Sequence, residues 1–112
     1  MSAGTYNLII DQGTTFTLDI TIKEDDVVKD LTGYSARAQM RATKTASSVA
    51  ASFTCTIPTP ANGTVKMALS PSTSSSMTAG QFFYDLEIYT SSDAIVKRIV
   101  EGTVTLTQEV TR

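Results

Sequence analysis

The stretch FFYDLEIYTSSDAIVKRIVEGTVTLT, residues 82–107, holds two runs of alternating apolar and polar side chains around a polar turn. A period of two places successive side chains on opposite faces of a β-strand. One face of the two runs consists of Phe82, Tyr84, Leu86, Ile88, Val100, Gly102, Val104 and Leu106. Ser91-Ser92-Asp93 has the composition of a tight turn. The stretch therefore predicts an antiparallel hairpin with one buried face and one exposed face.

The same alternation recurs along the rest of the chain. It covers residues 16–22, 34–41, 53–57 and 65–69, and a short apolar run lies at 6–10. Turn-forming residues separate these runs, at Asp11-Gln12-Gly13, at Lys23 to Asp30 and at Pro58 to Gly63. Asn62-Gly63 suits positive φ angles at both positions. The pattern predicts seven to eight short antiparallel strands in a sandwich or small barrel, with a hairpin or short excursion at 23–30.

Two segments depart from the alternation. Ser70 is a capping residue before Pro71, and Gly80 follows a few residues later. This order predicts one or two helical turns near 71–77 that cross between strands, with a flexible serine linker as the alternative. Ile99 and Val100 are adjacent apolar residues within the last run, which predicts a β-bulge or bend there.

Length and charge restrict the classes of protein. A chain of 112 residues is one domain, spanning 1–112. The net charge is −2 and the nine Lys and Arg residues are scattered, so we expect no nucleic acid as partner. No apolar run reaches the roughly 18 residues of a membrane helix, and no signal peptide is visible, so we expect no membrane partner and synthesis in a cytoplasm. The single Cys55 lies in an alternating run, which favours a small buried hydrophobe over a reactive thiol.

The residues that most enzymes need are missing from the sequence. There is no His, and the six Gly residues are dispersed, so we expect neither catalysis nor a cofactor or metal. Asp85 and Glu87 share a strand face and could flank a glycosidic bond. Their position on the polar face instead favours ion pairs across strands with Lys97 or Arg37.

Two other groups of residues leave alternatives open. Glu24, Asp25, Asp26 and Asp30 are oxygen donors that could take up Ca²⁺, although they lack the ligand spacing and turn glycine of a dedicated site. A solvated loop is the favoured interpretation. Phe83 and Tyr89 alternate with acidic residues on an outer strand face, where they could stack on a sugar or form a protein interface.

Five phrases of the sequence then occur in a recognisable order. They are DQGTTF at 11–16, DLTGYSAR at 30–37, LSP at 69–71 running to Gly80, YDLE at 84–87 and RIVEGTV at 98–104, before the ending EVTR at 109–112. In this order the chain resembles small virion proteins of tailed bacteriophages. It is also similar to the N-terminal domain of baseplate upper proteins, over nearly its whole length. The resemblance implies an immunoglobulin-like β-sandwich that serves as an adaptor or attachment module.

The function expected from this resemblance is structural. The chain would be a virion protein of a tailed phage, made in the host cytoplasm and located at the tail, baseplate, fibre or neck. Its partners would be other virion proteins, and it would form a homo-oligomer in the particle. Longer members of the family continue beyond the position of Arg112, which favours an attachment or covering role over host recognition and leaves contact with the host open. A capsid decoration protein is the alternative, and a carbohydrate-binding module is the alternative from another class.

The chain ends are candidate sites of assembly. Residues 1–10 and 107–112 could act as arms that add a strand to another sheet, or as ordinary edge strands of the monomer. Candidate interface residues are Tyr6, Leu8, Phe83, Tyr89, Val110 and Arg112.

Overall fold

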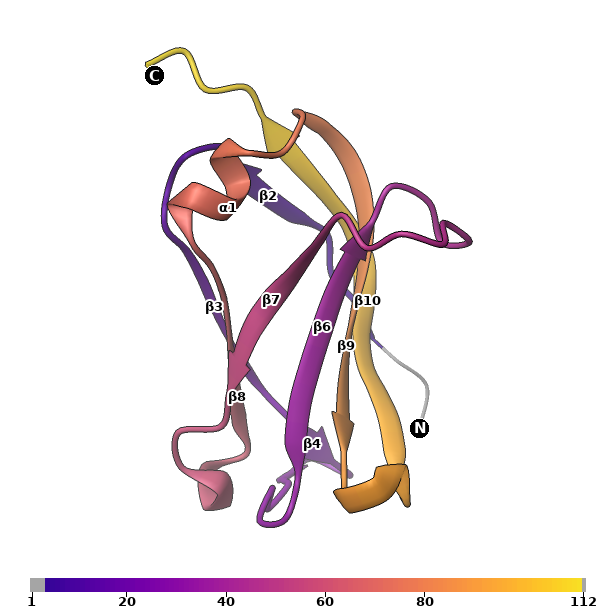
Figure 1. Ribbon diagram of the computed structural model, residues 1–112. Coiled ribbons are helices and arrows are strands. Elements are labelled where there is room, and N and C mark those ends of the chain that lie inside the picture. Colours follow the sequence, from indigo (N-terminus) through magenta and orange to yellow (C-terminus); the bar gives the residue numbers. More distant parts are fainter. Residues whose placement is uncertain (1–3, 112) are drawn as a thin grey trace.

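The computed structural model describes residues 4–111, which form a curled β-sheet folded into two layers (Figure 1). The main sheet contains eight strands in this part of the chain, and a two-stranded hairpin lies beside it. The strands of the main sheet are β1 (Gly4–Thr5), β2 (Leu8–Asp11), β3 (Phe16–Thr21), β6 (Ser35–Arg41), β7 (Ala51–Thr56), β8 (Thr64–Leu69), β9 (Gly80–Tyr89) and β10 (Val96–Thr107). The predicted all-β sandwich is confirmed.

The spatial order of the strands is β1, β10, β9, β6, β7, β8 and β3, with β2 also paired to β10. Strands β1 and β2 run parallel to β10, while the other neighbours are antiparallel. The sheet is therefore mixed, and the prediction of a wholly antiparallel sheet is wrong at this edge. It is mixed because the first strands reach β10 from the opposite end of the chain and not through a hairpin turn.

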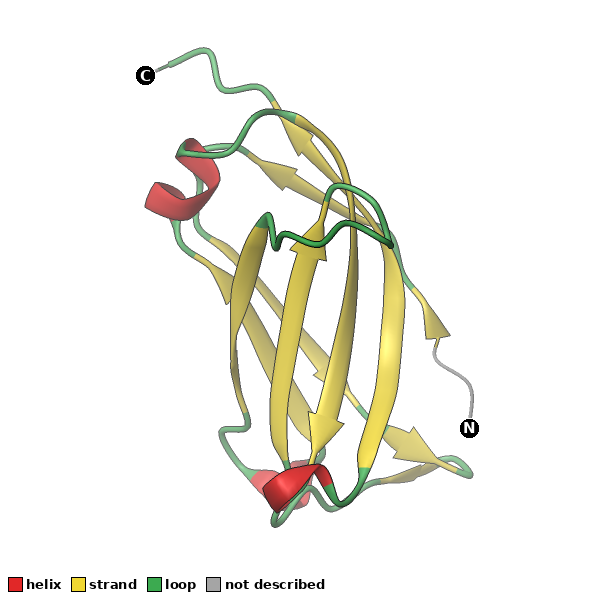
Figure 2. Cartoon of the chain, turned by 45° about the vertical axis from the view of Figure 1, so that its right-hand side comes forward, coloured by secondary structure: helices red, strands yellow, loops and turns green. Residues whose placement is uncertain are grey.

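Strand β7 passes from one layer to the other. Its first half pairs with β6, where Phe53 lies opposite Ala38, and its second half pairs with β8, where Cys55 lies opposite Met67. The strand thus closes the sandwich on one side without a loop between the layers. The curl of the sheet around the core is visible in Figure 2.

The core lies between the two layers and is built from the inward positions of the alternating strands. Val65, Met67, Leu86, Ile88 and Val104 are all 0% exposed. Aromatic rings connect the layers, because the Phe53 ring centroid lies 6.1 Å from that of Phe16 and 6.2 Å from that of Tyr84. The predicted inward faces are confirmed, although the inward residues of β3 stay half-buried. Burial of the apolar side chains is the main term that stabilises the fold.

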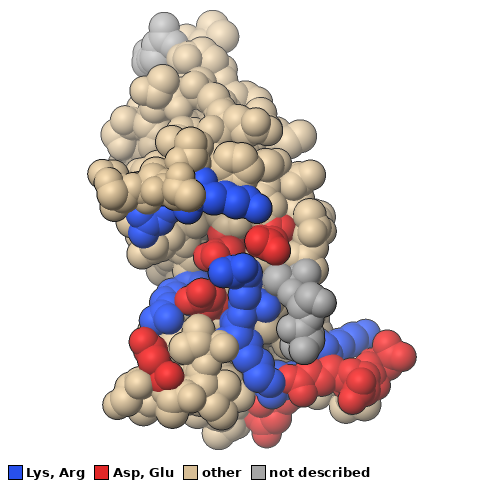
Figure 3. Space-filling view, turned by 90° about the vertical axis from the view of Figure 1, so that its right-hand side faces the viewer, with Lys and Arg blue, Asp and Glu red and all other residues tan. Residues whose placement is uncertain are grey.

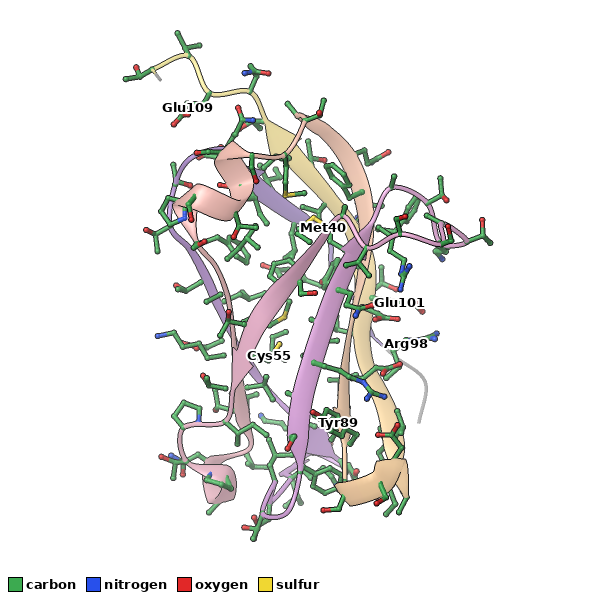
Figure 4. The ribbon with its side chains drawn as sticks, in the orientation of Figure 1. Met40, Cys55, Tyr89, Arg98, Glu101 and Glu109 are labelled. Atoms are coloured by element: carbon green, nitrogen blue, oxygen red, sulfur yellow. The ribbon has the colours of Figure 1, made fainter. Side chains whose placement is uncertain are left out.

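Cys55 lies between the layers but is only half-buried (Figure 4). Burial raises the pKa of its thiol to about 11, so the thiolate is scarce at neutral pH. The side chain packs against the core as a small apolar group, in agreement with the interpretation of Cys55 as structural, although its burial is incomplete.

Most turns form where the sequence places them. Strands β4 (Lys23–Glu24) and β5 (Val27–Val28) make the predicted hairpin, with Asp25 and Asp26 at φ 53° and 65°. A 3₁₀ turn, η2 (Ser91–Asp93), joins β9 to β10.

The connection between β7 and β8 differs from the prediction. It is a 3₁₀ turn, η1 (Pro60–Asn62), which ends at Gly63 with φ 67°. Only the glycine has a positive φ, so the prediction for Asn62 is wrong. The reason is that Pro60 begins a helical turn which includes Asn62.

The helical crossover is confirmed as α1 (Pro71–Ser75). The Ser70 hydroxyl accepts a hydrogen bond from the Thr73 amide at 3.3 Å, as expected of an N-cap. No helix within residues 4–111 has the length and apolar character needed to cross a membrane.

Candidate protein-interaction face

Basic and acidic side chains gather on the outer face of β6, β9 and β10 (Figure 3), and the aromatic side chains of Phe83 and Tyr89 lie among them. We call this surface the charged face. Its members are Arg37, Gln39, Arg41, Lys44, Phe83, Asp85, Glu87, Tyr89, Asp93, Arg98 and Glu101. Lys44 comes from the loop after β6, and Asp93 from the turn between β9 and β10.

Strand alternation places β6 and β9 side chains together on this face. On β9 the even-numbered apolar residues point inward, so Asp85 and Glu87 point outward. Arg37 on β6 lies directly opposite Glu87, and Gln39 lies opposite Asp85. At these positions the outward row is therefore basic or neutral on β6 and acidic on β9.

A β-bulge brings β10 into the same arrangement. The pairing of β9 with β10 shifts between Arg98 and Val100, so Ile99 has no direct partner. Without this extra residue, Arg98 would share the inward side of Val100, two positions along the strand. With it, both Arg98 and Glu101 lie on the outer face (Figure 4). The predicted bulge is confirmed, and it supplies the cation at the centre of the charged face.

One end of the charged face is a closed set of contacts around Arg37. Its guanidinium lies 2.9 Å from the Glu87 carboxylate and 3.4 Å from that of Asp93. The same group stacks over the Tyr89 ring, 4.4 Å from the ring centroid. The hydrogen bond to Glu87 raises the pKa of Arg37, so this cation stays charged. The predicted pairing of Glu87 with Arg37 is confirmed.

Lys97 does not join this face, so its predicted pairing with Asp85 or Glu87 is wrong. It precedes the bulge and lies on the opposite side of β10, where its ammonium is 3.1 Å from Glu24 on β4. Lys29 approaches the same Glu24 carboxylate at 3.0 Å. These two lysines lower the pKa of Glu24.

The centre of the charged face has an excess of acid. Glu101 lies directly opposite Asp85. The Arg98 guanidinium lies 3.3 Å from the Asp85 carboxylate and 3.9 Å from the Glu101 carboxylate. Burial raises the pKa of Asp85, and repulsion from Glu87 adds to the effect, while Arg98 opposes it. Like charges that lie directly opposite each other on neighbouring strands destabilise the strand pair. A basic group from outside would relieve this repulsion.

The other end of the charged face is basic. Arg41 donates to the Ala46 carbonyl at 2.9 Å and to the Gln39 side-chain oxygen at 3.2 Å. Lys44 lies over the Phe83 ring, 5.8 Å from its centroid. Neither cation forms an ion pair with a carboxylate in the part of the chain that the structure describes.

Between the two ends lies an open depression of about 530 Å³. Its walls offer cations at Arg41 and Lys44, and an acidic pair at Asp85 and Glu101. Such a surface can exchange ion pairs and hydrogen bonds with a polar surface of the opposite pattern. The rings of Phe83 and Tyr89 are half-buried, and a cationic side chain lies over each of them, so neither ring face is free to stack on a sugar.

The acidic loop does not assemble a cation site. The Glu24 carboxylate is engaged by two lysines, and Asp30 accepts hydrogen bonds from the Thr32 amide at 2.9 Å and hydroxyl at 2.6 Å. Within residues 4–111, no three His, Cys, Asp or Glu side chains come together in a way that could hold a metal ion.

The predicted interface residues are dispersed. Tyr6 and Val110 are exposed, at 53% and 87%, and neither side chain lines the depression of the charged face. The Tyr6 amide nevertheless donates to the Glu101 carbonyl at 2.9 Å, so its backbone borders that face. Leu8 is 4% exposed, because β2 turns it inward beside Val104, so its side chain belongs to the core and not to a surface. Arg112 lies outside the described residues.

Apart from Phe83 and Tyr89, the members of the charged face were not predicted as interface residues. Arg41 was detectable, because it shares the outward parity of Arg37. Lys44 lies in a loop, where no periodicity applies. Arg98 and Glu101 could be assigned to one face only by combining the alternation with a bulge placed at Ile99.

Comparisons with known proteins identify the fold. No protein-family model matches the sequence, and a search of curated proteins finds no relative. A solved structure, the N-terminal domain of phage TP901-1 ORF48, is similar with a TM-score of 0.58. The match covers 96% of this chain and 100% of that one, at 11% sequence identity. The two chains thus share a fold over their whole lengths.

Proposed function

We propose that this chain is a structural protein of a tailed bacteriophage virion, where it acts as an adaptor or attachment module. The observation that carries the proposal is the fold shared over 96% of the chain with a domain of a phage protein. The ordered phrases between residues 11 and 112 resemble baseplate upper proteins and support the same assignment. The tail, baseplate, fibre or neck is the proposed position.

The charged face is the proposed contact with a partner virion protein. The basic end at Arg41 and Lys44 would meet partner carboxylates, and the acidic pair at Asp85 and Glu101 would meet a partner cation. Docking of this kind gives orientation and specificity more than affinity, which suits a part that is held by many simultaneous contacts in a particle.

Quantitative mass spectrometry of purified particles of the encoding phage tests the assignment. An adaptor at the tail or neck is expected in tens of copies per particle. Hundreds of copies would replace it with the capsid decoration protein. Absence of the chain from washed particles would contradict both.

Charge reversal tests the docking surface. Arg41→Glu with Lys44→Glu should leave the chain folded but reduce its incorporation into particles severalfold, because the basic end then repels carboxylates. Lys23→Glu with Thr59→Glu and Ala61→Glu is the matched control, since all three residues are exposed, lie off the charged face and together change the net charge by the same amount. Equal incorporation of the two variants would contradict docking through the charged face.

A further inference from the structure

Strand β3 forms one edge of the main sheet, and no strand within residues 4–111 pairs with its outer side. Its six residues pair with β8 on one side only, from Phe16 opposite Leu69 to Thr21 opposite Thr64. Among the described residues, no other backbone hydrogen bond reaches this strand. The edge therefore presents a row of backbone donors and acceptors to solvent.

The apolar side of β3 is also incompletely covered. Phe16, Leu18 and Ile20 point toward the core but stay half-buried. Their direct partners on β8, which are Leu69, Met67 and Val65, are 3%, 0% and 0% exposed. The inward side chains of β3 are thus less buried than those of the neighbouring strand β8. A further strand paired to this edge would place its own inward side chains beside these three and bury them further.

Strand β3 carries only one of the devices that usually protect an edge strand, the exposed charge of Asp19. It contains no Pro, Gly or Lys, and its pairing with β8 runs without a bulge. The opposite edge differs, because β1 and β2 are short and a linker at Tyr6-Asn7 interrupts them. Within the described chain, β3 is the longer continuous edge.

We infer that β3 pairs antiparallel with β3 of a second copy of this chain. Residues opposite one another in an antiparallel pair lie on the same side of the sheet, so inward residues must meet inward residues. Centring the two-fold axis on Leu18 satisfies this condition and sets Phe16 opposite Ile20 of the second copy. The inference does not depend on the phage assignment.

Charge selects this register over its neighbour. With the axis at Leu18, Thr17 faces Asp19 of the second copy, and the hydroxyl can donate to the carboxylate. With the axis at Asp19, the two carboxylates would face each other directly, which is unfavourable. Asp19 also lies opposite Lys66 of its own chain. In this register Asp19 therefore has Lys66 on one side and Thr17 of the second copy on the other, and no like charge beside it.

The polar side of the edge suits association. Thr17 and Thr21 are exposed short side chains, which lose little conformational entropy when a neighbour covers them. One six-residue strand buries less than the roughly 800 Å² per partner of a standard interface. We therefore expect a weak, reversible dimer whose fraction rises with protein concentration.

Sedimentation equilibrium tests the dimer and its register. The native chain should shift toward twice its monomer mass as concentration rises. Thr17→Asp should weaken association roughly tenfold, since it sets two like-charge pairs across the axis, and Thr17→Lys should strengthen it. Thr54→Asp and Thr54→Lys are matched controls, because Thr54 is an exposed threonine on β7, away from the edge. A native chain that stays monomeric up to millimolar concentration, or Thr17 and Thr54 variants with equal effects, would overturn the inference.

Disulfide trapping tests the register without reliance on charge. In a Cys55→Ala background, proteins carrying Thr17→Cys and Asp19→Cys are oxidised separately and as a mixture. The register predicts rapid cross-linking in the mixture, because residue 17 faces residue 19 of the other copy, and slow cross-linking in each protein alone. Faster cross-linking of either protein by itself would overturn it.

Discussion

The two edges of the main sheet are finished in different ways. At the β10 edge, strands β1 and β2 cover the backbone, and side chains from distant parts of the chain hold them. The Tyr84 hydroxyl donates to the Tyr6 carbonyl at 2.6 Å, and the Thr103 amide donates to the Asn7 side chain at 3.0 Å. At the β3 edge, no strand of the described chain provides such cover. The difference shows that one edge of the sheet is closed by specific contacts while the other keeps free backbone groups.

The largest change in stability is expected at Gly102 on β10, which lies against the Tyr6-Asn7 linker between β1 and β2. A Cβ at this position would lie 2.3 Å from the Tyr6 carbonyl oxygen, which is backbone and cannot rotate away. Gly102→Ala should lower the free energy of unfolding by about 2–4 kcal/mol, measured by chemical denaturation. Gly4→Ala is the control, because its nearest neighbour would be 3.9 Å away. A Gly102→Ala protein as stable as Gly4→Ala would show that the edge is not tightly closed.

The next effect concerns Gln12, which ties three segments together at the end of β2. Its amide nitrogen donates to the Met77 carbonyl at 2.8 Å, and its oxygen accepts from the Glu109 amide at 2.9 Å. Gln12 is 8% exposed, so Gln12→Ala removes the side-chain hydrogen bonds to two part-buried backbone groups and should cost about 2 kcal/mol. Hydrogen exchange at the Glu109 amide should accelerate in this variant. Unchanged exchange would mean that Gln12 does not hold the C-terminal segment.

A smaller effect is expected at Tyr84. Tyr84→Phe removes one hydrogen bond to the Tyr6 carbonyl and should cost about 1 kcal/mol, whereas Tyr6→Phe, at an exposed ring, should cost little. Burial raises the pKa of Tyr84 from 10.0 to about 12. The folded chain therefore holds this proton more tightly, and its stability should fall as pH rises from 10.0 toward about 12. Tyr84→Phe should flatten that decline, and an unchanged alkaline decline would contradict the assignment.

The smallest effect is expected at the open edge. Thr17→Lys changes an exposed side chain with no described hydrogen-bond partner, so the free energy of unfolding of the dilute monomer should move by less than about 0.5 kcal/mol. Thermal denaturation at low concentration checks this. A loss comparable to that of Tyr84→Phe would mean that β3 is also held by contacts within the monomer.

Local patterns predicted the elements well. The alternation in 82–107 gives β9 and β10, and Ser70-Pro71 gives the cap and first turn of α1. Adjacent Ile99 and Val100 indicated the bulge. Each of these features is set by neighbours in the chain, so a short window of sequence contains the information.

Long-range features could not be predicted in the same way. Nothing in residues 51–56 signals that β7 changes layers halfway, because its alternation continues through the change. The position of Leu8 in the core depends on parallel pairing with β10, nearly a hundred residues away. The charged face likewise depends on the register of three strands and on one bulge, which together decide that Arg98 and not Lys97 meets Asp85.

A reconstruction of the virion would give the location of the chain, its copy number and its contacts in one experiment. We expect this sandwich at the tail, baseplate, fibre or neck, with the face around Asp85 and Arg98 against another virion protein. A particle that lacks the chain, or that holds it with the charged face exposed to solvent in every copy, would contradict the proposed function.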